Sequence, residues 1–292
     1  MLANVLGELE GLVSAGEVRF LWERGILQNR LCGCGDAFAD CEFWSAVLDR
    51  ALGPGSAQAR RDLATRMHAE LSDRTRLRTL PSHLSARRQV PDELTGVLGD
   101  LYAAIAEVSG ASAVVDSSKL PTYASLLTAV EPLDLRVVHF VRDPRAAAHS
   151  WRRLKPQPDL GAGAMMERRG AAKSAALWTV WNSSLAALWR TRSEQYVAVT
   201  YEEFLADPQG QVRRIVDRFA LDVDPSTVFA EPHVVHLSVH HTVAGNPSRH
   251  QHGLVSLVPD SEWQARMRPL DRWAVTALSA PALHRYGYRI RS

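Results

Sequence analysis

The stretch LRVVHFVRDPRAAAHSW constrains the fold more than any other part of this chain. Its first half, Leu135–Val141, is almost wholly apolar, as is typical of strands buried in parallel sheets. Asp143 is then a favourable N-cap, and Pro144 suits the first position of a helix because its φ is already fixed at a helical value. The stretch therefore predicts a buried strand, a tight turn and a helix that ends near Arg153.

Two further strands are predicted, and each is followed by a helix. Ala113–Val115 ends in the sequence DSSK ahead of a helix that begins at Pro121. Tyr196–Thr200 precedes a helix over Gln209–Phe219. This alternation predicts an α/β fold in which helices flank a parallel sheet on both faces.

The segments outside this pattern are interpreted as additions to a single domain. Residues 42–110 are mostly helical insertions, and residues 232–259, which are rich in His, Ser, Asn and Pro, are predicted to form an ordered loop or lid. Residues 17–30 are predicted to be one helix. Because we find no clear linker, we expect one domain over residues 1–292.

The composition limits the possible partners. The formal net charge is +2, from 34 basic and 32 acidic residues, so we expect no binding to nucleic acid and place any anion site locally. No apolar run approaches the roughly 18 residues of a membrane span, and the opening MLANVLGELEG lacks the basic start of a signal peptide. We therefore expect a cytoplasmic protein with reduced thiols.

Arg142 lies at the carboxyl end of the predicted strand, where open α/β sheets bind their ligands. Ser150 follows it by eight positions and is able to present a hydroxyl to the same anion. A guanidinium offers a forked, permanently charged donor that suits phosphate. The alternative is a capped helix whose Arg142 pairs with a carboxylate in the core, and the residues alone leave both interpretations open.

The sequence RDPRAAAHS resembles the motif with which sulfotransferases bind the 3′-phosphate of 3′-phosphoadenosine-5′-phosphosulfate. Further blocks resemble, in the same order, the bacterial carbohydrate and natural-product branch of that family. These blocks are SAGEVRFLWERG, CGCG…C…FW, VVDSSK, YEEFLADP and AGNPSRHQHG. The resemblance covers nearly the whole chain and implies a three-layer P-loop-like fold with a C-terminal lid loop.

The resemblance also implies roles for five residues. Arg142 and Ser150 would hold the 3′-phosphate of the donor. Asn246 and Arg249, in the late loop GNPSRH, would close over that phosphate and the adenine, although Arg249 could instead be a solvated loop arginine. Tyr201 matches a position that contacts the nucleotide in relatives, and a packing role at the start of a helix is the alternative.

One expected motif is not recognisable. Sulfotransferases carry a glycine- and serine-rich loop that wraps the 5′-phosphosulfate with backbone N–H groups. The opening MLANVLGELEG resembles the helix that follows this loop, so the strand and loop, roughly 20 residues, are expected upstream of Met1. A start site placed too late, a shortened chain or a degenerate protein would each explain this, and the first two are favoured because the downstream blocks look intact.

Sulfuryl transfer needs a base near the acceptor hydroxyl and cations around the sulfuryl group. Glu17 is the candidate base, because in some bacterial relatives a glutamate serves as the base at about this point. A first-turn carboxylate favoured by the helix dipole is the alternative. Lys119, at the end of VVDSSK, could neutralise the sulfuryl oxygens or orient the acceptor. Asp116 could act as a base or cap the next helix.

A metal centre is not expected. The histidines of residues 233–241 fit no standard ligand spacing. Cys32, Cys34 and Cys41 could form a three-thiolate zinc corner, but the sequence lacks the usual CxxC pairs, so buried structural thiols are favoured.

Together these features predict a sulfotransferase that moves a sulfuryl group from 3′-phosphoadenosine-5′-phosphosulfate to a hydroxyl of a small molecule or saccharide, leaving 3′-phosphoadenosine-5′-phosphate. No metal is required. The alternatives are a non-catalytic relative that retains only a 3′-phosphate pocket, and a P-loop kinase, although the loop GxxxxGK[ST] is missing. The oligomeric state is open, with a homodimer as one option.

Overall fold

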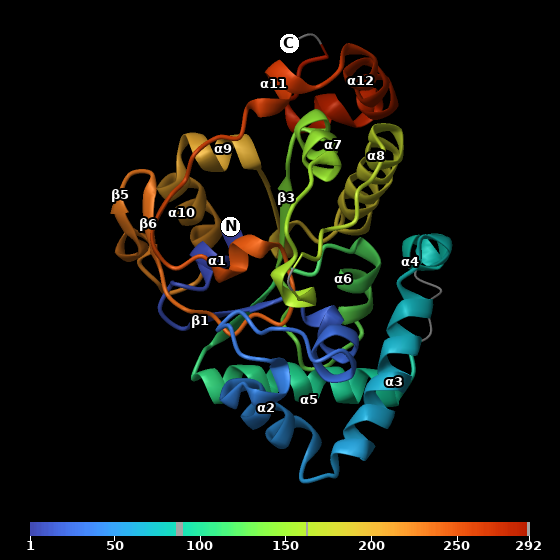
Figure 1. The fold of residues 1–292 in the computed structure, drawn as a ribbon, viewed down its shortest axis with the longest axis vertical. Helices are drawn as coiled ribbons and strands as arrows, with labels where there is room; N and C mark the ends of the chain where they lie inside the picture. The colour runs from blue at the N-terminus through green and yellow to red at the C-terminus, as the bar shows by residue number, and fades with distance from the viewer. Residues whose placement is uncertain (86–89, 162, 291–292) are drawn as a thin grey trace. The chain divides into compact units, whose positions relative to one another are not determined.

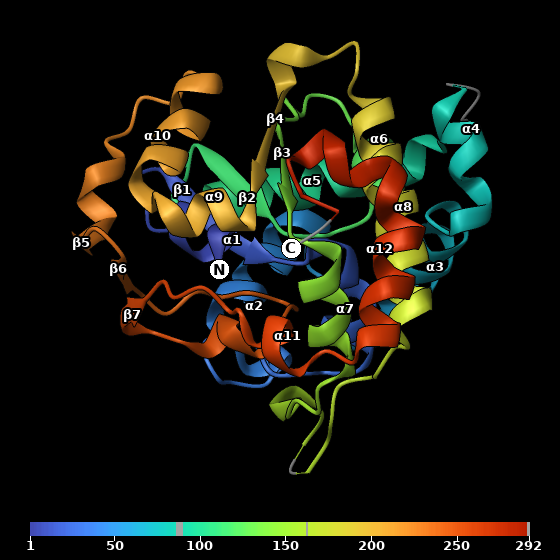
Figure 2. The same cartoon turned by 90° about the horizontal axis from the view of Figure 1, so that it is seen from above.

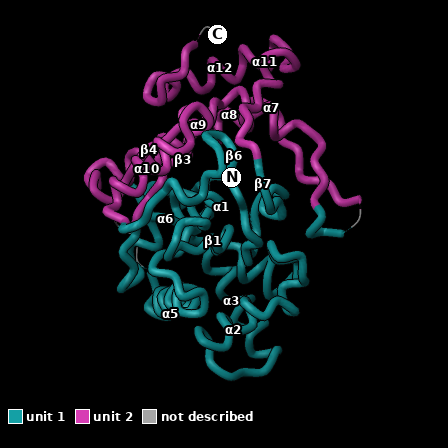
Figure 3. The backbone as a smooth tube through the Cα atoms, turned by 90° about the vertical axis from the view of Figure 1, so that its left-hand side faces the viewer, with its two compact units in different colours: residues 1–135, 158–162, 222–255 teal, residues 136–157, 163–221, 256–292 magenta. Residues whose placement is uncertain are grey.

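The computed structural model describes residues 1–85, 90–161 and 163–290. The chain forms two compact units, each built from separate stretches of sequence (Figure 3). Unit 1 comprises residues 1–135, 158–162 and 222–255, and unit 2 comprises residues 136–157, 163–221 and 256–292. One domain over the whole chain stays a prediction.

Unit 1 contains a parallel pair of strands, β1 (Leu12–Gly16) and β2 (Ala113–Asp116). Leu12 pairs with Ala113 and Gly16 with Asp116, so the carboxyl ends of both strands lie at the same edge. The helices α1 (Leu2–Leu6) and α5 (Asp92–Ser109) each pack on both strands (Figure 1). The apolar side chains of α1, Leu2, Val5 and Leu6, are buried.

A helical layer completes unit 1. It consists of α2 (Glu42–Leu52), which lies along α5, α3 (Ala57–Arg74), α4 (Leu80–Leu84) and α6 (Pro121–Leu127) (Figure 1). The largest side chains buried in this core are Trp22, Trp44, Tyr123, Leu98, Leu101 and Ile105. The insertions before β2 thus supply about half of the apolar core of unit 1.

Two sequence predictions for unit 1 need correction. The segment predicted as one helix over residues 17–30 forms a 3₁₀ turn, η1 (Val18–Phe20), followed by a π-helix, η2 (Leu21–Leu27). Asp116 accepts the backbone N–H of Val18 and so caps η1 through a contact 98 positions distant, which sequence periodicity cannot reveal.

The predicted lid, residues 232–259, is also more regular than expected. It contains the strands β6 (Val234–Leu237) and β7 (Gly253–Ser256), which form a small sheet in the order β5-β6-β7 with β5 (Phe229–Glu231). A 3₁₀ helix, η8 (Pro247–His250), lies between β6 and β7. These elements are too short to show a clean period, which is why the sequence indicated a loop.

Unit 2 contains the second parallel pair, β3 (Val137–Val141) and β4 (Tyr196–Thr200), paired in register along its length. The helices α7 (Pro144–Arg152), α8 (Ala171–Leu188) and α12 (Pro269–Leu283) pack on one another in this unit (Figure 2). Small side chains lie in this interface. They are Ala146 and Ala148, with Ala171 and Ala175 from α8.

The remaining helices of unit 2 are α9 (Tyr201–Ala206), α10 (Pro208–Arg218) and α11 (Glu262–Arg266). A capping box at Thr200 and Glu203 starts α9 immediately after β4. Among the described residues, none of the helices has both the length and the apolar content needed to cross a membrane. The fold is mixed α/β, with two separate two-stranded parallel sheets where one continuous sheet was expected.

Candidate functional site

Glu17 and Lys119, which the sequence proposed separately as catalytic residues, lie together at the carboxyl edge of unit 1. Glu17 directly follows β1, and Lys119 follows β2 by three residues. The Lys119 ammonium donates to the Glu17 carboxylate. Glu17 is buried, with 9% of its side chain exposed, whereas 63% of the Lys119 side chain is exposed. The pair therefore places a sheltered carboxylate beside a cation that solvent can reach.

Asp116 has a structural place in this edge. Its carboxylate accepts hydrogen bonds from the Tyr102 hydroxyl at 2.5 Å and from the backbone N–H groups of Ser118 at 2.7 Å and Val18 at 3.2 Å. Burial raises the pKa of Asp116, although these hydrogen bonds oppose the shift. Every lone pair that faces the protein is engaged, so capping is favoured over catalysis.

The segment that follows residue 240 runs along the end of β1. The backbone N–H of Val243 donates to Ala15, and that of Glu17 donates to Ala244 at 3.2 Å. Gly16 has φ +80°, and a Cβ there would lie 2.8 Å from the Ala244 oxygen. Glycine is therefore required for the segment to approach Glu17 this closely.

Arg249 is buried in this part of unit 1. Its guanidinium donates to the backbone oxygens of Thr242 and Leu31, the latter at 2.6 Å. The solvated-loop alternative is therefore excluded in this structure, because only 6% of the residue is exposed. Asn246, three positions earlier, is exposed and accepts the backbone N–H of Arg249. The buried Arg249 side chain therefore stabilises the loop through hydrogen bonds to backbone oxygens.

Unit 2 holds a second group of polar side chains, which we call the Arg142 cluster: Arg142, Ser150, Arg153, Lys155, Tyr201 and Asp260. Arg142 donates to the Asp260 carboxylate at 3.1 Å and stands 4.5 Å from the centre of the Tyr201 ring. The indole N–H of Trp178 donates to the Arg142 carbonyl at 2.9 Å and fixes the backbone there. The strand end is thus held from α8.

Ser150 lies within the same cluster. Its hydroxyl accepts from the Lys155 ammonium at 2.7 Å, and Arg153 donates to Asp260 at 2.7 Å. Burial lowers the pKa of Lys155, and the charges of Arg153 and Arg142 lower it further. Burial raises the pKa of Asp260, but hydrogen bonding and charge from the two arginines outweigh this and leave it below its ordinary value. Arg142 and Arg153 therefore share one carboxylate, while Lys155 binds Ser150.

The predicted turn with Asp143 as the N-cap of α7 is confirmed, and the arginine that pairs with a buried carboxylate there is Arg145, not Arg142. The Asp143 carboxylate accepts the backbone N–H of Arg145 at 2.8 Å and caps α7. The same carboxylate also binds the Arg145 guanidinium, at 2.9 Å to Nε and 2.6 Å to a terminal nitrogen. The buried pair is thus Asp143–Arg145. This leaves Arg142 with the more exposed Asp260, 28% of whose side chain is accessible.

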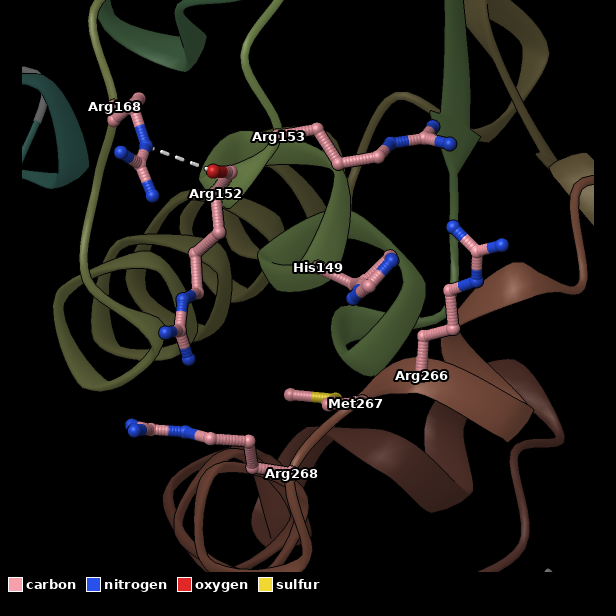
Figure 4. A pocket seen from close by; sticks show the side chains of 7 residues that line it. All are labelled: His149, Arg152, Arg153, Arg168, Arg266, Met267 and Arg268. Atoms are coloured by element: carbon pink, nitrogen blue, oxygen red, sulfur yellow. Dashed lines mark hydrogen bonds between the residues drawn. The ribbon is translucent and has the colours of Figure 1, made fainter.

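Further basic side chains of unit 2 line a pocket of about 200 Å³ (Figure 4). The lining residues are His149, Arg152, Arg153, Arg168, Arg266, Met267 and Arg268. Asp271 accepts from Arg152 and from Arg268, the latter at 2.8 Å, so carboxylates offset part of this charge. Because Arg153 belongs to both groups, the pocket adjoins the Arg142 cluster.

A sequence model of the sulfotransferase family matches residues 43–225, which is more than half of the chain. The chain belongs to the sulfotransferase family. The match spans β2, β3, β4 and the segment that carries Arg142 and Ser150, so the geometry above is that of a sulfotransferase family member.

A solved structure, the sulfotransferase domain from the curacin biosynthetic pathway, has a similar fold. The two chains superpose with a TM-score of 0.57 at 14% sequence identity, over 99% of this chain and 93% of that one. A comparison with curated proteins finds no significant match. The similarity supports the mixed α/β sulfotransferase fold.

The sequence analysis did not identify three residues of the Arg142 cluster. Arg153 and Lys155 follow α7 and carry no motif, although their closeness to Ser150 in sequence was a usable signal. Asp260 lies 118 positions beyond Arg142 and gave none. A fourth omission is His241, which joins the three cysteines in unit 1. The expectation of no metal is therefore not supported.

Proposed function

We propose that this chain transfers a sulfuryl group from 3′-phosphoadenosine-5′-phosphosulfate to a hydroxyl of a small molecule or saccharide, within a P-loop-like arrangement of its strands. Family membership supports a sulfotransferase over a P-loop kinase. The observation that carries the donor assignment is the group of polar side chains after β3, in which Arg142 and Arg153 both donate to Asp260 and Lys155 donates to Ser150.

The chemistry of the cluster fits a phosphate dianion. Among the residues that the structure describes, the buried Nε atoms of Arg142 and Arg153 have no hydrogen-bond partner. A buried donor without a partner costs about 1–3 kcal/mol, which a phosphate oxygen would recover. Asp260 is half-buried and is the exchangeable counter-ion: the 3′-phosphate would take its place on Arg142, with Ser150 as a neutral donor.

In unit 1, Glu17 and Lys119 are proposed to act on the acceptor. The donor, when bound, supplies an activated sulfuryl group. The hydroxyl oxygen of the acceptor forms a bond to sulfur while the bond from sulfur to the 5′-phosphate oxygen breaks. The hydroxyl proton passes to the Glu17 carboxylate, and the Lys119 ammonium neutralises charge on the sulfuryl oxygens. Proton and charge balance without a metal in this step.

The other predicted contacts remain proposals. Tyr201 presents its ring to Arg142 and would border the nucleotide. Asn246 is exposed and free to reach the donor, whereas Arg249 would first have to release the carbonyls of Thr242 and Leu31. We therefore assign Arg249 the role of positioning the loop, in preference to direct contact with the donor.

The proposal is tested by titration calorimetry with 3′-phosphoadenosine-5′-phosphate. Arg142→Ala is expected to weaken binding about 100-fold or more, because charge-assisted hydrogen bonds to phosphate are lost. The matched control is Arg213→Ala, which removes an exposed arginine of α10 in the same unit. Equal affinity in the two variants sinks the donor assignment. Binding without sulfuryl transfer to any hydroxyl acceptor favours the non-catalytic alternative.

A further inference from the structure

Three cysteines and a histidine of unit 1 gather around a common point. Their ligand atoms all lie within 4.8 Å of one another, although the cysteines and the histidine are about 200 positions apart in sequence. The four residues are Cys32, Cys34, Cys41 and His241. None of them takes part in the proposed sulfuryl transfer, so the cluster needs a separate explanation.

The distances within this cluster match a tetrahedral metal site. With Zn–S bonds of about 2.3 Å, the sulfurs of a regular tetrahedron lie about 3.8 Å apart. Cys34 Sγ lies 3.8 Å from Cys41 Sγ. The Nδ1 atom of His241 lies 3.2 Å from Cys41 Sγ and 4.0 Å from Cys32 Sγ. A disulfide would require about 2.05 Å, so these spacings belong to separate ligands.

The backbone around the cysteines is shaped to hold them there. Gly33 has no room for a side chain: a Cβ would lie 2.3 Å from the His240 oxygen. Its N–H donates to Thr242 at 2.9 Å, which brings the cysteine loop against the segment that carries His241. Gly35 has φ +101° and allows the loop to turn back sharply.

Two further contacts resemble the outer shell of a metal site. The backbone N–H of Cys34 donates to the Cys32 sulfur, and that of Asp36 donates to the Cys34 sulfur. The imidazole of His241 stacks on Phe43 with ring centres 4.9 Å apart, which fixes the direction of its Nδ1. Such contacts orient the ligands.

We propose that Cys32, Cys34, Cys41 and Nδ1 of His241 bind one Zn²⁺ ion. Three sulfurs and one imidazole nitrogen complete a tetrahedron, which leaves no position for water or substrate and makes the site structural. On binding, the three thiols release their protons to solvent and Zn–S bonds form.

The site has a clear structural consequence in unit 1. It joins the cysteine loop to the segment whose next residues pack on β1, where Ala244 accepts the N–H of Glu17. Zinc would therefore hold in place the backbone that supports Glu17. This inference does not rest on the proposed sulfuryl transfer, and its test reads metal content and spectra, not activity.

The first test is the metal content of the full chain purified without a chelator. Mass spectrometry of elements is expected to find about one zinc per chain. After removal of zinc, titration with Co²⁺ should give thiolate-to-cobalt charge-transfer bands and the intense d–d bands of a tetrahedral site. Zinc removal should also lower the thermal midpoint by about 5 °C or more.

Variants locate the site. Cys34→Ser, at the half-exposed ligand, should weaken the cobalt bands and reduce the zinc retained after dialysis at least tenfold, and His241→Asn should do the same. His236→Asn, at an exposed histidine of β6, is the matched control and should retain the metal. The proposal is overturned if the chain contains no zinc and shows no cobalt bands. It is also overturned if reduction adds the mass of two hydrogen atoms, which would reveal a disulfide. Cobalt titration of the unaltered chain keeps the test valid if a variant misfolds.

Discussion

The two parallel strand pairs end in opposite kinds of chemistry. At the edge of β1 and β2, a buried carboxylate, Glu17, is paired with a lysine that is largely exposed. At the end of β3 in unit 2, Arg142 and Arg153 share a half-exposed carboxylate, Asp260. Both groups lie at the carboxyl ends of parallel strands, which is where open α/β sheets bind their ligands.

This difference between the two edges suggests that the first serves the chemical step and the second serves donor binding. A buried carboxylate that can take a proton suits the acceptor hydroxyl, whereas a group of cations with a replaceable counter-ion suits a phosphate. Changes at the first edge should therefore alter turnover, and changes at the second should alter donor affinity. The predictions below test this division, beginning with the largest expected effect.

Glu17→Gln should reduce turnover about 100-fold or more, because the amide cannot accept the hydroxyl proton. The affinity for 3′-phosphoadenosine-5′-phosphate should stay within twofold of the original. Steady-state rates and calorimetry on the same preparation measure the two quantities. The control is Glu10→Gln, an exposed glutamate of the same unit. If Glu17→Gln weakens product binding as much as turnover, the division between the edges fails.

The two units should also respond oppositely to acid. Burial lowers the pKa of His139 on β3 from 6.5 to about 4, while burial raises the pKa of Asp116 on β2 above 3.8. Between pH 6.5 and 4 the unfolded chain binds the extra proton at His139, so unit 2 loses stability as the pH falls. Just above pH 3.8 the folded chain holds the extra proton at Asp116, so unit 1 gains stability as the pH falls.

The loss from His139 is on the order of 3 kcal/mol. The neutral ring is held on both sides, since the Tyr196 hydroxyl donates to Nδ1 at 2.6 Å and Nε2 donates to Asn182 at 2.8 Å. His139→Gln should therefore flatten the decline between pH 6.5 and 4. Hydrogen exchange on β3 and β4, compared with β1 and β2, measures it unit by unit. An unchanged slope in the variant contradicts the assignment.

Much of the second edge could be predicted from the sequence, because the signals were local. The apolar runs of β3 and β4 gave their bounds to within two residues, and the cap at Asp143 follows from residue type alone. Lys119 was expected to follow a strand, but β1 was not predicted, so the shared edge of Glu17 and Lys119 is seen only in the structure. Local chemistry was sufficient for β3, β4 and the cap.

The remainder depended on contacts between distant segments. Asp260 meets Arg142 across 118 positions, and His241 meets Cys41 across 200. Neither pairing leaves a period or spacing in the sequence, so the cysteines looked like isolated thiols. Arg249 is a related case: its polar loop left a solvated arginine open as the alternative, but in the structure the side chain is buried and donates to two backbone carbonyls.

Asp260→Asn should increase affinity for 3′-phosphoadenosine-5′-phosphate about threefold to tenfold. The carboxylate competes with phosphate for Arg142 and Arg153, and the amide removes the negative charge while its oxygen can still accept. Asp217→Asn, an exposed carboxylate of α10, is the control for the change in net charge. A fall in affinity would instead mean that Asp260 orients the arginines, and the counter-ion role would be withdrawn.

The smallest expected effect concerns Tyr201. Two substitutions there distinguish contact through the ring from hydrogen bonding through the hydroxyl. The guanidinium lies 4.5 Å from the ring centre, a cation–π contact of about 0.5–1 kcal/mol at a partly exposed site. Tyr201→Phe keeps the ring and should leave product affinity within twofold, whereas Tyr201→Leu should weaken it about threefold. Calorimetry at fixed salt resolves the two. If the phenylalanine variant loses as much as the leucine variant, the hydroxyl carries the contact, and binding at this edge depends on a neutral donor as well as on the cations.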